Sequence, residues 1–475
     1  MKVTLFRADM GDCLLVSGTP STPNAGDGGQ LLVDGGMGFA YTAHVASALN
    51  RLRTAGQKID LVCVSHVDED HIGGVLQMLD DEVEWRVYDH QLQSGHPAAT
   101  EPVAPRPPEI GGIWHNAFHE QVGKNAGPIS DLLGASAAML SGVEAAHLLP
   151  IATERRELAT STGQAIQLSR RIGERQMKIP RNQEFGGKLV MVKDAMPAPT
   201  VVGSMRLRVI GPFEDDLARF ATEWNKWLRS EREQLKQIRR RARSDEERLA
   251  TSEVDRIARL TRAQGEELAR FELNRAGIAE ESLTPGEGLA AEKVLGSRAK
   301  VTLPNLVSVM LLVEEEEEKS VLLTGDGHRN EILRGLAWHK KLQDDTAEEG
   351  GSLHVNVLKV QHHASEHNID LDFARRITAD DYIFCANGKH ENPDLDVLRA
   401  IYDARLGPDD GTRTTTVPAS RHFRWWFSSH PSVVKSPTAK GHMERVKELA
   451  DKLELESSGR LRATFLEKDM QVIPV

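Results

Sequence analysis

The chain has 475 residues, 40% of them apolar, so its length and composition allow two or three structural units and a sizeable buried core. Its formal net charge of −11 excludes a protein that coats nucleic acid non-specifically, because such binding requires clustered lysine and arginine. The three cysteines are far apart in sequence, which excludes a disulfide framework and a thiolate zinc site. We find neither a signal-peptide core nor a run of roughly 18 uncharged apolar residues, and we therefore expect a soluble cytoplasmic protein with no membrane partner.

The first 36 residues are organised as strands. Residues 3–7 alternate between apolar and polar, residues 13–17 and 30–33 are mostly apolar, and turns that contain glycine separate these segments. The last segment ends in Asp34-Gly-Gly. The two glycines allow a tight turn beside the aspartate. Residues 41–54 then carry apolar side chains at helical spacing, which predicts a helix.

The stretch 61–75 brings together several side chains that bind metals. Residues 61–64 are apolar and rich in valine, which predicts a buried strand. The loop after this strand contains four potential ligands: His66, Asp68, Asp70 and His71. Side chains at the carboxyl end of such a strand can converge on one point, so the cluster predicts a metal site. An exposed polar turn is the alternative interpretation.

The middle of the chain has a different character. We predict a short strand at 83–88, an irregular loop through 91–128, helices within 129–185, and strands at 186–192 and 205–210. The highly charged stretch that follows has thinly spaced apolar residues, which favour a helical hairpin or a dimer seam. Its basic run at 236–243 is either a solvated helix face or a phosphate contact. We divide the chain into residues 1–214, a charged helical insertion at 215–300, and residues 301–475.

Strands return after residue 301, and polar residues again follow their ends. We predict strands at 305–313 and from 320, the second ending in Thr-Gly-Asp326. After a predicted helix at 329–343, a strand from 355 ends in His362-His363-Ala-Ser. The next predicted strand, at 381–387, leads to His390, and a helix follows at 394–404.

These motifs resemble those of the metallo-β-lactamase fold hydrolases. The signature of that fold is His-x-His-x-Asp-His followed by x-Gly-Gly, and residues 66–74 match it except that Asp68 replaces the second histidine. The Asp34-Gly-Gly segment resembles the first motif of the fold, and Thr-Gly-Asp326 resembles the fourth. The matches follow the order of the family and cover residues 1–80 and 300–400.

The aspartate variant is similar to a subgroup that includes the hydrolase domain of ComEC-type DNA-uptake proteins and the teichoic-acid phosphorylcholine esterases. Residues 358–365 resemble the Leu-Lys-x-x-His-His-Gly-Ser of that subgroup, and residues 387–393 resemble its Asn-x-x-x-His-Pro segment. Only residues 11–13 match its Gly-x-Gly-Asp-Ala/Cys opening. The third motif of the fold, normally a histidine, is missing, and Asn305 stands in its place.

The resemblance implies an α+β fold, an αββα sandwich with a long charged helical insertion. It implies two divalent metal ions, Zn²⁺ or Mn²⁺, with the ligands His66, Asp68, Asp70, His71, Asp326 and His363. Asp34 would hold the metal loop by hydrogen bonds, and Asn305 would be a weak ligand. The expected catalytic residues are Asp70, His362 and His390, with both histidines facing the substrate.

The function implied is a metal-dependent phosphodiesterase or nuclease in which a metal-bound hydroxide is the nucleophile. Asp68 adds a hard oxygen ligand, which favours tolerance of Mn²⁺ as well as Zn²⁺. Two alternatives remain: the same fold hydrolysing a small ester, lactam or lactone, and a metal-impaired binding or assembly protein that acts through residues 215–300. The expected partners are a phosphodiester substrate and, at the insertion, a second copy of the chain or another protein.

Overall fold

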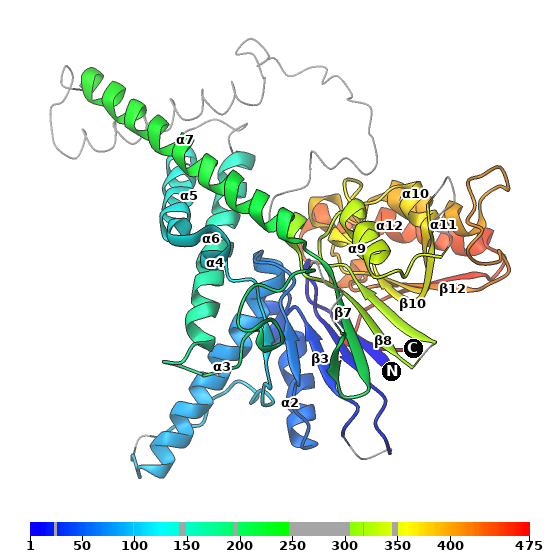
Figure 1. The fold of residues 1–475 in the computed structure, drawn as a ribbon, viewed down its shortest axis with the longest axis horizontal. Helices are drawn as coiled ribbons and strands as arrows, with labels where there is room; N and C mark the ends of the chain where they lie inside the picture. The colour runs from blue at the N-terminus through cyan, green and yellow to red at the C-terminus, as the bar shows by residue number, and fades with distance from the viewer. Residues whose placement is uncertain are drawn as a thin grey trace. The chain divides into compact units, whose positions relative to one another are not determined.

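The computed structural model describes residues 1–22, 26–97, 99–141, 149–193, 198–246, 305–316, 318–343 and 350–475. The chain is divided into two compact units. Unit 1 comprises Met1–Ala117, Gln167–Leu217 and Val294–Val475, and unit 2 comprises Phe118–Ile166 and Ala218–Lys293. Every strand of the described residues belongs to unit 1 (Figure 1).

Unit 1 contains two β-sheets. The first has the strand order β14-β1-β2-β3-β4-β5 and the second has the order β13-β12-β11-β10-β9-β8-β7-β6. The strands of the first sheet are β1 (Lys2–Phe6), β2 (Leu14–Ser17), β3 (Gln30–Val33), β4 (Leu61–Cys63), β5 (Ile113–Trp114) and β14 (Met470–Pro474). Those of the second are β6 (Thr200–Val202), β7 (Met205–Gly211), β8 (Met310–Glu315), β9 (Lys319–Leu323), β10 (Leu353–Lys359), β11 (Ile377–Phe384), β12 (Phe423–Phe427) and β13 (Leu461–Phe465).

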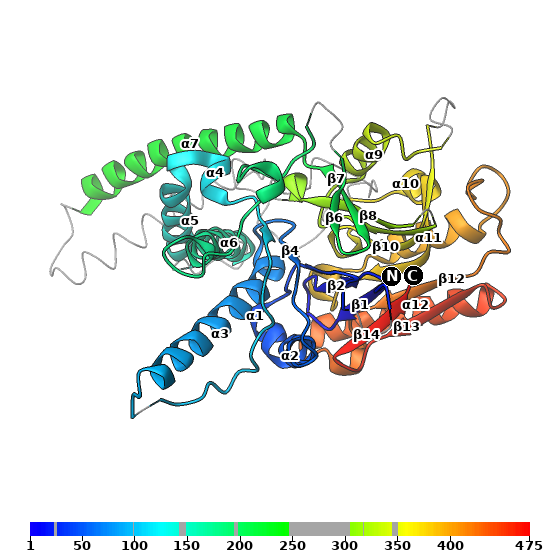
Figure 2. The same cartoon turned by 60° about the horizontal axis from the view of Figure 1, so that its bottom comes forward.

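Each sheet combines antiparallel and parallel pairs. In the first, β1 is antiparallel to both β14 and β2, so the two ends of the chain lie side by side (Figure 2). β3 and β4 are parallel. In the second sheet the strands from β9 to β13 are all parallel, and β6, β7 and β8 add to one edge in antiparallel fashion.

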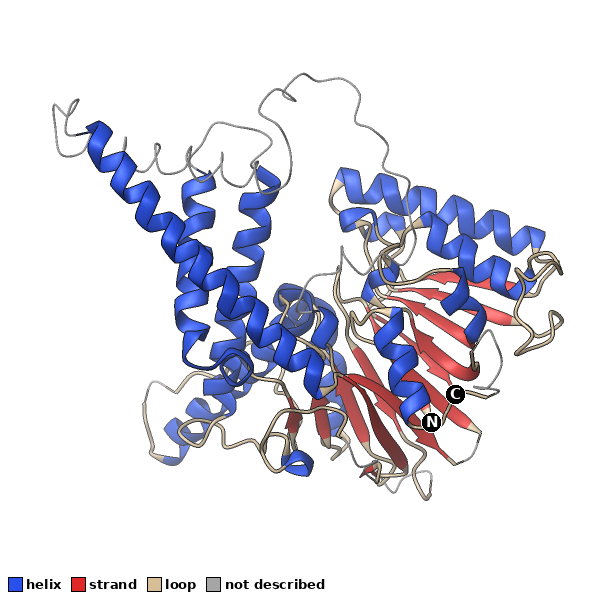
Figure 3. Ribbon diagram, turned by 45° about the horizontal axis from the view of Figure 1, so that its top comes forward, coloured by secondary structure: helices blue, strands red, loops and turns tan. Residues whose placement is uncertain are grey.

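The helices complete the layers. The described α-helices are α1 (Gly38–Ala40), α2 (Ala46–Thr54), α3 (Glu69–Gln93), α4 (Phe118–Val122), α5 (Ala126–Ser141), α6 (Leu149–Ile172), α7 (Glu214–Glu246), α9 (Arg329–Trp338), α10 (Leu371–Arg376), α11 (Leu395–Leu406) and α12 (Pro437–Glu456). α9 to α12 cover the outer face of the second sheet (Figure 3). α2 and α3 lie next to the first sheet (Figures 1 and 2). Within the described ranges, none of the helices is long and apolar enough to cross a membrane.

Two apolar cores explain this layering. One fills the space between the sheets, with Val3 and Leu31 from the first sheet and Leu311 and Val357 from the second, all buried. The other lies between the second sheet and its four helices. Strands whose alternate side chains enter two different cores must be covered on both faces. The expected αββα sandwich is therefore confirmed.

Three predicted strands differ from the structure, and the loop expected through residue 128 contains α4. Residues 83–88 belong to α3 and form no strand, because a helix begun at residue 69 meets neither glycine nor proline between residues 75 and 93 and simply continues. Residues 305–307 form a 3₁₀ turn, and the strand begins only at Met310. Residues 186–192 contribute one isolated bridge, from Val192 to Phe213, instead of a strand.

Unit 2 has a core of its own that includes α4 and the start of α7. Phe118 makes edge-to-face contacts with Phe220 and Trp224, at ring-centroid distances of 6.2 Å and 5.8 Å, and all three side chains are buried. The last two lie one helical turn apart on α7, so one face of this charged helix is apolar. Asn125 also donates a hydrogen bond to Asn225 Oδ1 at 2.5 Å.

Much of the predicted insertion at 215–300 falls outside the described residues. α7 covers the part up to Glu246, which includes the backbone of the basic run at 236–243, but residues 247–304 and the side chains of that run are not described. The dimer seam and the phosphate contact at the insertion stay predictions.

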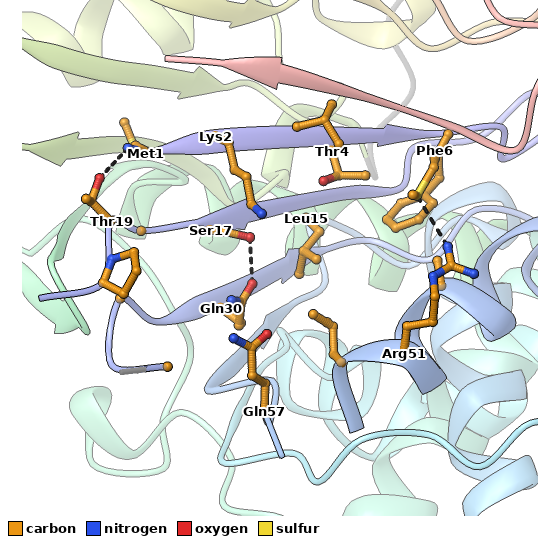
Figure 4. Close-up of a pocket in the computed structure, with 18 residues that line it drawn as sticks. Met1, Lys2, Thr4, Phe6, Leu15, Ser17, Thr19, Gln30, Arg51 and Gln57 are labelled. Atoms are coloured by element: carbon orange, nitrogen blue, oxygen red, sulfur yellow. Dashed lines mark hydrogen bonds between the residues drawn. The ribbon is translucent and has the colours of Figure 1, made fainter. Parts of the chain in front are cut away.

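A cavity of about 470 Å³ opens on the outer face of the first sheet, against α2 (Figure 4). Ser17 Oγ donates to Gln30 Oε1 at 2.6 Å in this cavity, and Arg51 reaches Met470 Sδ at 3.8 Å. None of the predicted metal-binding or catalytic residues lines it. The site described next is therefore separate from this cavity.

Candidate metal centre

The predicted ligands follow the carboxyl ends of parallel strands in both sheets of unit 1. β3 and β4 are parallel and end just before Asp34 and His66. β9 and β10 are also parallel and end just before Asp326 and His362. Because the carboxyl ends of parallel strands meet at one edge of a sheet, each sheet gathers its polar loops at a single edge. The side-chain contacts below show that the two edges meet.

Two glycine pairs let the motif loops approach each other closely. The Gly35 N–H donates to the carbonyl of His71 at 2.8 Å, and the Gly74 N–H donates to the carbonyl of Gly36 at 2.7 Å. A Cβ at position 74 would lie only 1.9 Å from the carbonyl oxygen of Gly35. The two Gly-Gly pairs of the sequence therefore act together to hold the start of α3 against the turn after β3.

Asp34 is fully buried and holds the loop after β4 by three hydrogen bonds. Its Oδ1 accepts from the Ser65 N–H at 2.7 Å, and its Oδ2 accepts from Ser65 Oγ at 2.7 Å and from His71 Nδ1 at 2.9 Å. Its backbone φ of 58° is in the left-handed region, which aspartate tolerates better than most residues. Since Nδ1 of His71 carries the proton, its Nε2 presents a lone pair to the centre.

Four histidines aim Nε2 at the carboxylate of Asp326, which is 3% exposed. The distances from Nε2 to the nearer carboxylate oxygen are 3.9 Å for His66, 3.4 Å for His71, 3.8 Å for His362 and 3.4 Å for His363. The Nδ1 atoms contact, in the same order, Ser65 Oγ, Asp34 Oδ2, Asn368 Oδ1 and the carbonyl of Cys385. Metal-binding histidines typically have this arrangement, because the second ring nitrogen is held by a hydrogen bond.

Two further carboxylates come from the start of α3. Asp68 Oδ2 lies 3.5 Å from His66 Nε2, and Asp70 Oδ2 lies 3.1 Å from His363 Nε2. Asp68 is the N-cap residue of α3 and Asp70 lies in its first turn, where the helix dipole favours a negative charge. The two aspartates thus contact different imidazoles of the same cluster.

A buried ion pair that our sequence analysis did not assign to the site lies beneath this cluster. Lys359 Nζ is 2.5 Å from Asp12 Oδ2 and 3.4 Å from Asp326 Oδ1, and it donates to the carbonyl of Gly325 at 2.7 Å. The signal for both residues was present in the matches to Gly-Asp-Cys and to Leu-Lys-x-x-His-His. Those matches did not show that residues 12 and 359 touch.

Asp12 lies on the Nδ1 side of two of these imidazole rings. Its carboxylate oxygens lie 3.8 Å from His71 Nδ1 and 3.6 Å from His363 Nδ1. Asp12, His71 and His363 form one close-set group of potential ligands, and His66, His71 and Asp326 form a second. The Nδ1 atoms of the first group already donate to Asp34 and to the carbonyl of Cys385, so Asp12 is placed to support the rings and not to share a cation with them.

The charges of the cluster shift the pKa values of its members. Burial alone would lower the pKa of His71 and of His363, but the carboxylates, that of Asp326 foremost, raise the pKa of His71 well above its ordinary value and that of His363 to about 10. Burial would raise the pKa of Asp326 and of Asp70, yet the neighbouring imidazoles hold both well below their usual range. For His362, burial outweighs the carboxylate and lowers the pKa. Asp70 and Asp326 are therefore ionised at neutral pH, and without a metal they favour the protonated rings of His71 and His363. A divalent cation would take the place of those protons on the Nε2 atoms.

The donor set fits a divalent cation. His66 Nε2, His71 Nε2 and Asp68 Oδ1 are buried and have no hydrogen-bond partner among the described residues. Leaving such atoms unpaired is costly, and imidazole and carboxylate are ordinary ligands of Zn²⁺ and Mn²⁺. The residues present thus match the metal that the resemblance implies.

Asn305 and His390 are placed differently from these ligands. Asn305 is buried, and its Nδ2 lies 3.0 Å from His362 Nε2, so it adjoins the cluster through that ring. His390 is exposed in the 3₁₀ turn Lys389–Glu391, which follows β11. Because β11 is parallel to β10, His390 belongs to the same edge of the second sheet as His362.

The sequence model of the metallo-beta-lactamase superfamily matches residues 9–108. This range contains Asp34 and the cluster from His66 to His71. Among curated proteins, the comparison finds no match to the chain. The superfamily match and the close-set histidines and aspartates together indicate a metal-dependent hydrolase.

Proposed function

We propose that this protein hydrolyses phosphodiesters in a metal-dependent reaction. The observation that carries the proposal is the convergence of four imidazole Nε2 atoms on the carboxylate of Asp326, with Asp68 and Asp70 beside them. A carboxylate shared between two sets of ligands suits two neighbouring divalent ions. Paired ions of this kind are used for in-line displacement at phosphorus.

The residues proposed to hold the ions are His66, Asp68, Asp70, His71, Asp326 and His363, and the ions proposed are Zn²⁺ or Mn²⁺. When bound, such ions supply Lewis acidity and lower the pKa of water to near neutrality. The mixture of imidazole and carboxylate ligands is acceptable to both metals.

The chain itself supplies orientation and charge. Asp34 holds the His71 ring in the tautomer that exposes Nε2, and the carbonyl of Cys385 does the same for His363. Lys359 pairs with Asp12 and, together with the neighbouring imidazoles, favours the ionised form of Asp326. His390, exposed at the same edge of the second sheet, is proposed to donate a hydrogen bond to a phosphate oxygen.

The choice of a phosphodiester over an ester, lactam or lactone is supported by the sequence at the site. Asp68 in place of a histidine and the segment 358–365 are the features that resemble the phosphodiester-cleaving subgroup. A hydrolase of small esters would have the same cluster of histidines and aspartates. The substrate class is therefore tested directly.

The test is turnover of bis-p-nitrophenyl phosphate and of p-nitrophenyl acetate by purified protein with added Mn²⁺ or Zn²⁺. We expect metal-stimulated cleavage of the phosphodiester that the Asp326→Ala variant reduces to background. The control is Asp451→Ala, which removes an exposed carboxylate from α12 and should leave turnover unchanged. Metal-stimulated cleavage of the acetate alone, or equal phosphodiester turnover by Asp326→Ala, would overturn the proposal.

A further inference from the structure

We propose that the cavity on the outer face of the first sheet binds a small organic anion that carries an apolar body. The cavity has a volume of about 470 Å³, within the range of about 300–1,000 Å³ that is usual for small-molecule sites. Its lining residues all belong to unit 1, and none of them is a proposed metal ligand. Binding here is independent of the proposed hydrolysis and can be tested without turnover.

The strand register of the first sheet forms the floor of the cavity. Lys2 of β1 is paired with Ser17 of β2, and Ser17 is paired with Gln30 of β3. Paired residues of neighbouring strands project from the same face of a sheet, so these three form one polar row. In the next row of this face, Thr4 is paired with Leu15. The alternate residues of the same strands enter the core between the sheets.

The sides of the cavity are mostly apolar. Phe6 of β1 and Met470 of β14 are cross-strand partners, and both line it. Val472 adds apolar surface from β14, where it is 41% exposed, and Leu52 adds apolar surface from α2. Burying such surface against the body of a ligand is favourable, because it removes apolar area from water.

Two cationic side chains enter the cavity from different elements, Lys2 from β1 and Arg51 from α2 (Figure 4). Neither forms an ion pair within the described ranges, and Arg51 has only the weak contact with Met470 Sδ at 3.8 Å. The 18 lining residues, all of them described, include no aspartate or glutamate. The cavity is therefore positive in a chain whose formal net charge is −11, and its field favours an anion.

Two acidic side chains bond to the wall of the cavity from outside, and each already has a cation of its own. Glu315 is paired with the ammonium group of Met1 at 2.7 Å, and Asp60 lies 3.4 Å from Lys58 Nζ. Each carboxylate also accepts a hydrogen bond from the backbone N–H of a lining residue. Neither carboxylate is therefore left to neutralise the two cations of the cavity.

Two buried polar side chains on the floor offer hydrogen bonds to a ligand. Gln30 is 8% exposed; its Oε1 accepts from Ser17 Oγ at 2.6 Å, and its Nε2 has no partner among the described residues. Thr4 is 5% exposed, and its hydroxyl likewise has no partner in the described part of the chain. Carboxylate, sulfonate and phosphate oxygens accept from amide and hydroxyl groups. Together with the two cations, these groups fit the oxygens of an anionic headgroup.

The test uses the amphipathic anion 8-anilinonaphthalene-1-sulfonate, a dye whose fluorescence rises when it leaves water. We expect the metal-loaded wild-type protein to bind the dye saturably. The double variant Lys2→Gln/Arg51→Gln should weaken binding at least about tenfold, because a charged hydrogen-bond partner is lost at each position. The control is Lys447→Gln/Lys452→Gln, which removes the same charge from surface ion pairs on α12 and should leave the affinity unchanged.

A second pair of variants tests the volume of the cavity. Ala48 is half-buried on α2 and lines the cavity, so Ala48→Phe places a ring in it and should weaken dye binding. Ser47→Phe places the same ring on the exposed neighbouring position of α2 and should leave the affinity unchanged. Circular dichroism and thermal unfolding show that each variant is folded.

Wild-type dye affinity in the folded Lys2→Gln/Arg51→Gln variant would overturn the proposal. The same holds if Ala48→Phe and Ser47→Phe bind the dye equally well, or if the wild-type protein shows no saturable binding. Failure of the proposed hydrolysis leaves these results unchanged, since none of the substituted residues belongs to the metal centre.

Discussion

The ammonium nitrogen of Lys359 lies 2.5 Å from Asp12 Oδ2 and 3.4 Å from Asp326 Oδ1, and all three side chains are at most 4% exposed. Burial would lower the pKa of Lys359, but Asp12 and Asp326 raise it well above its ordinary value. The centre therefore contains a permanent positive charge of its own. That charge joins strand β10 to the turns after β1 and β9.

The first prediction concerns this ion pair. Lys359→Met leaves the carboxylate of Asp12 buried without its cation, and we expect the free energy of unfolding in urea to fall by about 3–5 kcal/mol. Combining it with Asp12→Asn should restore part of the loss, since the uncompensated charge is then gone. The matched control is Lys447→Met, which breaks an exposed pair with Asp451 on α12 and should cost at most about 0.5 kcal/mol. If the two lysine substitutions lower the free energy of unfolding equally, the buried pair stabilises the fold no more than the exposed pair does.

The second prediction concerns the contact between the two glycine pairs. A Cβ in Gly74→Ala meets the carbonyl oxygen of Gly35, so we expect at least about 2 kcal/mol lower stability and weaker metal binding. Gly441→Ala on α12 is the control, because nothing lies within 4 Å of its added Cβ. Alanine in that helix should be neutral or stabilise by up to about 1 kcal/mol. Thermal unfolding of both variants decides the matter, and an unchanged Gly74→Ala would contradict the close packing.

The third prediction concerns the support of His71 by Asp34. In Asp34→Asn the side chain keeps its size but loses its charge and one acceptor oxygen, so at least one bond to Ser65 or His71 is lost. We expect Zn²⁺ affinity, measured by competition with a chelator, to fall about 10–100-fold. Asp372→Asn, at a half-exposed aspartate of α10, is the control and should bind the metal as the wild type does. If Asp34→Asn binds Zn²⁺ with wild-type affinity, Asp34 does not support the metal loop.

The motif residues could be placed from the sequence because local order decides their position. A buried strand delivers the residues after it to one edge of a sheet, so the strand before His66 and the strand before Asp326 each predicted a polar cluster. The αββα layering was implied by the resemblance of these motifs to those of the metallo-β-lactamase fold hydrolases. Residues 83–88 were misjudged because valine and tryptophan alternate there, while the actual structure was decided by a helix begun fourteen residues earlier.

By itself the sequence determined which chemical groups the centre contains and which strands carry them, since those depend on neighbours along the chain. Only the tertiary structure decided that Lys359 pairs with Asp12 and that His362 Nδ1 contacts Asn368 Oδ1. The same holds for Asn305, which contacts His362 through its amide nitrogen. These relationships join side chains from separate turns, and the distances between such atoms depend on how the two sheets pack. Motif spacing along the chain carries no information about that packing.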